Sequence, residues 1–78
     1  MPMIEYNEQS NRVWLEASEV TPVILLEEVR EALRLYPGAD INVSMLGVPL
    51  WQYYSYWSAL YPYGVNICYS NSLAKGQV

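Results

Sequence analysis

Residues 49–61 read PLWQYYSYWSALY, and this stretch decides the fold because it suits either a helix or a pair of strands. Wound as a helix at 100° per residue, it gathers large side chains on one side: Leu50, Tyr53, Tyr54, Trp57, Leu60 and Tyr61. The opposite side holds Trp51 and the small or polar residues, with Tyr56 at the margin. As a strand it alternates poorly, because Ser55 and Ala59 would share a face with the two indoles. We therefore predict a helix over 49–61, with a strand or hairpin as the alternative, since aromatic residues favour strands.

The stretch belongs to a longer segment, residues 41–74, that carries no charged side chain. This segment holds eight of the eleven aromatic residues: Trp51, Tyr53, Tyr54, Tyr56, Trp57, Tyr61, Tyr63 and Tyr69. Tyr and Trp combine a large apolar body with one polar group, and they are enriched at protein interfaces. A domain of this size cannot bury all of its aromatics completely, so we expect an exposed aromatic patch that serves as a binding surface.

Sequence patterns on either side of the aromatic stretch predict the other elements. Short strands are predicted at 3–6, 12–17, 40–45 and 65–69, where the residues favour strands and mostly alternate between apolar and polar. The polar run at 7–11 is rich in turn-forming residues, so it joins the first two strands as an antiparallel hairpin.

A longer helix has clear start and stop signals. Thr21 can cap the free N–H groups, and Pro22 suits the first helical position. Pro37-Gly38 ends the helix near Tyr36. Its apolar face comprises Leu25, Leu26, Val29, Ala32, Leu33 and Tyr36, and its charged face comprises Glu27, Arg30, Glu31 and Arg34.

The order β-β-α-β-α-β predicts a small α+β fold, with one compact domain over residues 1–70 and a loose tail over 71–78. A strand–helix–strand connection is almost always right-handed and leads to a parallel strand. We therefore expect a mixed four-stranded sheet with two helices on one face. The other face is predicted to be polar and solvated apart from one indole, and it comprises Trp14, Glu16, Asn42, Ser44, Asn66 and Cys68.

Composition argues against several classes of function. The 78 residues include one cysteine and no histidine, so we expect no disulfide within the chain, no metal site and no cofactor. The net charge is −4 with four basic residues, which are too few for direct nucleic-acid binding. The uncharged segment is broken by glycine and proline and lacks close basic flanks, so no membrane span is expected. The N-terminus lacks a secretory signal, and we expect a cytoplasmic protein.

The arrangements of residues that usually carry catalysis are also missing. Cys68 has no histidine to activate it, and it falls within a predicted strand. Glu27, Glu28 and Glu31 are interleaved with arginines, a pattern that is typical of a solvated helix face. We therefore predict that the chain is not an enzyme.

The leading hypothesis is a small, acidic, non-catalytic protein-binding module. Such modules often act as inhibitors or regulators, including those that phages encode against host defence complexes. The predicted partner-binding residues are Trp51, Tyr56, Tyr63 and Trp14 as aromatic anchors, and Glu27, Glu28 and Glu31 as steering charges. Trp57, Leu50 and Leu60 are assigned to the core. The expected partner is another protein or a second copy in a homodimer. The alternative is a small-ligand-binding domain with an aromatic cage between the second helix and the sheet.

Overall fold

The computed structural model describes residues 4–69, and the tail predicted over 71–78 lies outside them. The strands are β1 (Glu5–Asn7), β2 (Arg12–Glu16), β3 (Asp40–Ser44) and β4 (Asn66–Cys68). The helices are α1 (Pro22–Leu35) and α2 (Tyr53–Leu60), accompanied by the short 3-10 helices η1 (Ala17–Glu19), η2 (Leu50–Gln52) and η3 (Tyr61–Tyr63). Because η2, α2 and η3 follow one another without a break, the helix predicted over 49–61 is confirmed and the hairpin alternative is wrong.

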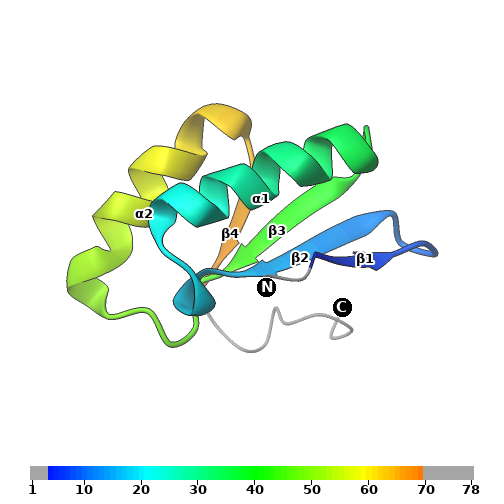
Figure 1. The fold of residues 1–78 in the computed structure, drawn as a ribbon. Coiled ribbons are helices and arrows are strands. Elements are labelled where there is room, and N and C mark those ends of the chain that lie inside the picture. The colour runs from blue at the N-terminus through cyan, green and yellow to red at the C-terminus, as the bar shows by residue number, and fades with distance from the viewer. Residues whose placement is uncertain (1–3, 70–78) are drawn as a thin grey trace.

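The four strands form one mixed sheet in the order β1-β2-β3-β4. β1 and β2 are antiparallel, and the pairs β2–β3 and β3–β4 are parallel. Figure 1 shows α1 and α2 together on one face of this sheet. Both crossovers advance in the same direction along the sheet, so two connections of the same hand place both helices on the same side. The predicted architecture is confirmed.

The core lies between α1 and the two central strands. Alternate residues of β2 and β3 point toward α1, as the twofold period of a strand requires. The buried residues of this layer, each at most 5% exposed, are Val13, Leu15, Ile41 and Val43 from the strands and Leu25, Val29 and Ala32 from α1. Burying one such large apolar side chain stabilises the fold by about 1.5–3 kcal/mol.

α1 begins where the sequence predicts. The side-chain oxygen of Thr21 accepts a hydrogen bond from the backbone N–H of Ile24 at 3.3 Å, and Pro22 is the first helical residue. The helix ends before Gly38, whose φ of +87° suits glycine. The apolar face is narrower than predicted, because Leu33 is 39% exposed. Leu33 lies one helical turn after Val29, at the edge of the buried face of α1, so it is covered only in part.

The second face of the sheet differs from the prediction of an open, solvated surface with an exposed indole. Trp14, Ser44 and Cys68 are only 5–6% exposed, so the predicted role of Trp14 as an exposed anchor is wrong. β2 is an interior strand, and the register places Glu5 and Asn42 on either side of the indole. Its Nε1–H donates to the Glu16 carboxylate at 2.7 Å, which satisfies the polar group of this buried side chain.

We predict that Thr21→Ala lowers the free energy of unfolding by about 1 kcal/mol, because the helix N-terminus loses its capping oxygen. Urea denaturation measures this as a lower midpoint at unchanged slope. Thr21→Ser keeps the oxygen and is the matched control. An alanine variant as stable as the wild type would show that this cap does not contribute.

Candidate functional site

A row of large side chains lies exposed along the helical run that α2 occupies. Leu50, Tyr54, Trp57 and Tyr61 follow one another at spacings of four, three and four residues, and they are 78%, 74%, 41% and 67% exposed. This spacing places them on one flank of a helix. Trp51, beside them, is 79% exposed. We call these five residues the α2 stripe.

The rings of the stripe are in contact with each other. The ring centroids of Tyr54 and Trp57 lie 6.3 Å apart, and those of Trp57 and Tyr61 lie 4.9 Å apart, at tilts of 29° and 33°. Tyr and Trp have only two side-chain torsions, and these mutual contacts restrict them further. A surface that is already ordered loses less conformational entropy when a partner covers it.

The opposite flank of α2 holds the fold together. Leu60 is fully buried, as predicted. Tyr56 is 5% exposed, and its hydroxyl donates to the backbone carbonyl of Val20 at 2.6 Å. The predicted role of Tyr56 as an exposed anchor is therefore wrong, as is the assignment of Leu50 and Trp57 to the core. Aromatic residues occur on both flanks, so the hydrophobic pattern alone gave the wrong rotation of the helix.

Tyr63 contacts α1 rather than standing free. Its hydroxyl accepts hydrogen bonds from Nε and Nη2 of Arg30 at 3.2 and 3.1 Å, and the guanidinium lies 5.9 Å from the ring centroid. The ring is half-buried. Tyr63 therefore joins η3 to α1, and this contact uses the polar group that a free anchor would offer to a partner.

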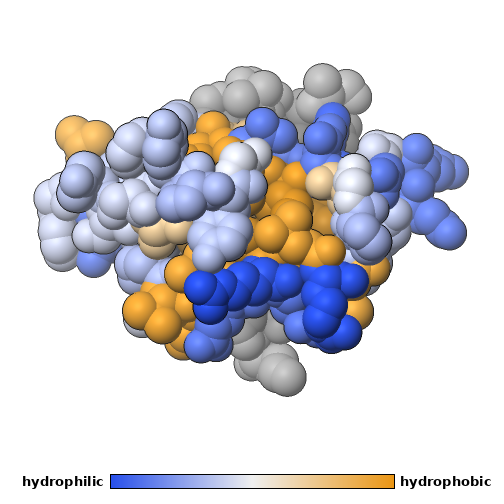
Figure 2. All heavy atoms as spheres, turned by 90° about the horizontal axis from the view of Figure 1, so that it is seen from above, coloured by the Kyte–Doolittle hydropathy of each residue, from blue (hydrophilic) through white to orange (hydrophobic). Residues whose placement is uncertain are grey.

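The stripe lies on the flank of α2 that faces away from α1. Tyr63 reaches Arg30 of α1, and Tyr56 reaches Val20, which precedes α1. On a helix of 100° per residue, Tyr56 lies about 100–160° around α2 from the residues of the stripe. Figure 2 shows the helix-covered face, with pale spheres over α2, blue spheres over α1 and an apolar strip between them. Charge and aromatic surface are thus separated onto two helices.

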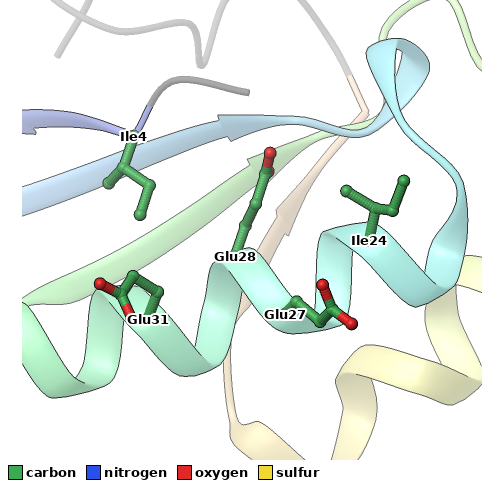
Figure 3. Close-up of a pocket in the computed structure, with 5 residues that line it drawn as sticks. All are labelled: Ile4, Ile24, Glu27, Glu28 and Glu31. Carbon is green, nitrogen blue, oxygen red and sulfur yellow. The ribbon is translucent and has the colours of Figure 1, made fainter. Parts of the chain in front are cut away.

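The three predicted acidic residues do come together. Glu27, Glu28 and Glu31 line an open hollow of about 460 Å³ with Ile4 and Ile24. Figure 3 shows Ile4, next to β1, facing the row of α1 side chains. The two helices cover the β2–β4 side of the four-stranded sheet and leave its β1 side uncovered. The hollow therefore lies on the β1 side of α1, away from α2.

The carboxylates in this hollow differ in their electrostatic environment. Burial raises the pKa of the Glu28 carboxyl, and the nearby carboxylate of Glu19 raises it further. A hydrogen bond from Arg34 lowers the pKa of Glu31, and the two side chains form an ion pair. Glu28 is thus a carboxylate that the fold destabilises, whereas the charge of Glu31 is largely balanced.

Two other kinds of site are not found among the described residues. Within 4–69, no three His, Cys, Asp or Glu side chains converge where they could hold a metal ion. No helix in that range has the length and apolar character needed to cross a bilayer. Burial raises the pKa of the Cys68 thiol, which disfavours the reactive thiolate.

Comparisons with protein-family models, curated proteins and solved structures give no match for this chain. The candidate site therefore rests on the residues themselves. Trp51 is the predicted aromatic anchor whose exposure the structure bears out, and Tyr54 and Tyr61 were missed together with the exposed Leu50 and Trp57. One signal in the sequence does point to them, because the aromatic residues of 51–61 extend over more of the helix circumference than a single sheet can cover.

We predict that Tyr56→Phe costs about 1 kcal/mol of stability, because the Val20 carbonyl loses its donor. Tyr54→Phe removes a hydroxyl from a ring that is 74% exposed, and it should leave stability unchanged. Chemical denaturation of both variants measures the difference. Equal midpoints for the two variants would contradict the structural role of Tyr56.

We predict that Glu28→Gln stabilises the fold at pH 7. The folded-state pKa of Glu28 lies above its ordinary value of 4.5, so the ionised form opposes folding at neutral pH. This penalty disappears as the pH falls through the raised pKa and below 4.5, so the advantage of glutamine should vanish in acid. Denaturation at a series of pH values measures it, with Glu27→Gln as the control for net charge. A glutamine variant without advantage at pH 7 contradicts the assignment.

Proposed function

We propose that this chain is a small, acidic, non-catalytic protein-binding module, acting as an inhibitor or regulator through the α2 stripe. The observation that carries the proposal is the exposure of Leu50, Trp51, Tyr54 and Tyr61, each 67–79% accessible on one helical run. Exposed apolar surface of this size on a small domain usually marks an interaction site. Trp and Tyr are also the residues most enriched among binding hot spots.

A macromolecular partner fits this surface better than a small ligand does. Small-ligand sites are concave and enclose most of their ligand, whereas the stripe lies on the outward surface of a helix. The aromatic cage predicted between the second helix and the sheet would need open space there. Tyr56 and Leu60 fill that layer and belong to the packed core.

The acidic side of α1 adds a preference for the charge of the partner. Glu27 and Glu28 lie in the hollow beside the apolar side chains of Ile4 and Ile24. A lysine or arginine combines an aliphatic stem with a charged end, so it suits both parts of this lining. Charges placed outside the apolar contact mainly raise the rate of association with a basic partner.

The test measures how tightly the tagged full-length chain captures a defined protein partner. We expect the paired substitution Trp51→Ala with Tyr54→Ala to weaken binding by more than about 2 kcal/mol, since truncated hot spots typically cost this much. Leu35→Ala is the matched control, because Leu35 is an exposed apolar residue (45%) on α1 outside the stripe. Denaturation midpoints verify that each variant folds. A partner that binds the paired variant as tightly as the wild type would contradict the proposal.

A further inference from the structure

The spacing of the α2 stripe is the same in both directions. Leu50, Tyr54, Trp57 and Tyr61 are separated by four, three and four residues. When two such helices pack antiparallel, Leu50 of one copy meets Tyr61 of the other, and Tyr54 meets Trp57. A twofold axis requires this kind of pairing, in which one patch is complementary to itself.

Electrostatics also permits two copies to meet on this flank. The chain carries a net charge of −4, so most contacts between two copies would bring like charges together. Residues 41–74 are uncharged, and the stripe lies within them. The charged helix α1 lies on the other side of α2, so the acidic residues of the two copies would remain far apart. Burying this surface leaves no unpaired charge.

The exposed area is close to what a stable dimer needs. Each large aromatic buries about 150–250 Å² when it is covered, so the stripe at its observed exposure offers roughly 600 Å² per copy. A standard specific interface buries about 800 Å² per partner. The stripe therefore supplies most of such an interface, and its immediate neighbours on the helix can supply the remainder.

We propose that the α2 stripe binds a second copy of this chain, with two α2 helices packed antiparallel so that Tyr54 of each copy faces Trp57 of the other. This inference rests on the proposed function, because it names the first protein partner of the same surface. The twofold axis passes beside the middle of the helical run, between residues 55 and 56.

The first experiment is light scattering coupled to size exclusion on the full chain over a concentration series. The expected mass is twice the 9.0 kDa of one chain. Trp57→Lys should raise the dissociation constant more than ~30-fold, as expected for a central hot spot. Leu35→Lys introduces the same charge at an exposed position on α1 and should remain dimeric. A monomeric wild type at the highest accessible concentration, or a dimer that survives Trp57→Lys, would overturn the proposal.

A mixing experiment tests the antiparallel register. Tyr54→Glu and Trp57→Lys should each be monomeric alone. Mixed in equal amounts they should recover the dimer mass, because the introduced carboxylate of one chain faces the introduced ammonium of the other. A parallel pairing would not bring these groups together, so a mixture that stays monomeric overturns the register. Denaturation midpoints near that of the wild type establish that both variants fold.

The two proposals fail separately. A monomeric wild type whose stripe variants lose a different, defined protein partner overturns the second-copy proposal and leaves the proposed function standing. Stripe variants that alter neither self-association nor capture overturn both.

Discussion

The hydrogen bond between the Tyr56 hydroxyl and the Val20 carbonyl, at 2.6 Å, sets the rotation of α2. A buried tyrosine must place its hydroxyl against an acceptor, because an unpaired polar group in the interior is costly. Val20 lies just before α1, so the bond joins the middle of one helix to the start of the other. With Tyr56 and Leu60 turned inward, Leu50, Tyr54, Trp57 and Tyr61 are left facing solvent. The exposure of the candidate site is thus a consequence of how the buried Tyr56 hydroxyl finds its hydrogen-bond acceptor.

The elements and their arrangement could be predicted from local patterns, since each strand and helix has its own periodicity and end signals. The rotation of α2 could not be predicted from local patterns, because it depends on the hydrogen bond between Tyr56 and Val20, which are 36 positions apart in the sequence. The hydrophobic pattern does not indicate this rotation either, because α2 carries aromatic residues both on the flank that packs against the core and on the flank that faces solvent. The same holds for Tyr63, whose hydroxyl meets Arg30 across 33 positions.

The prediction that Trp14 is exposed was wrong for a different reason. Its neighbours along β2 alternate as expected, and it does lie on the face away from the helices. The strands at either side place Glu5 and Asn42 next to the indole. A pattern within one strand contains no information about the size of side chains on the next. Trp51, by contrast, lies in the short 3-10 helix at the start of the run, where no residue is buried.

The separation of charge from aromatic surface has a consequence for how the molecule responds to its medium. At physiological ionic strength, interactions between exposed charges are screened beyond about 8 Å. Salt therefore weakens any contact made by the acidic hollow beside α1, while it leaves a contact made by the α2 stripe almost untouched. One helix is thus sensitive to the composition of the solution, and the other is insensitive to it.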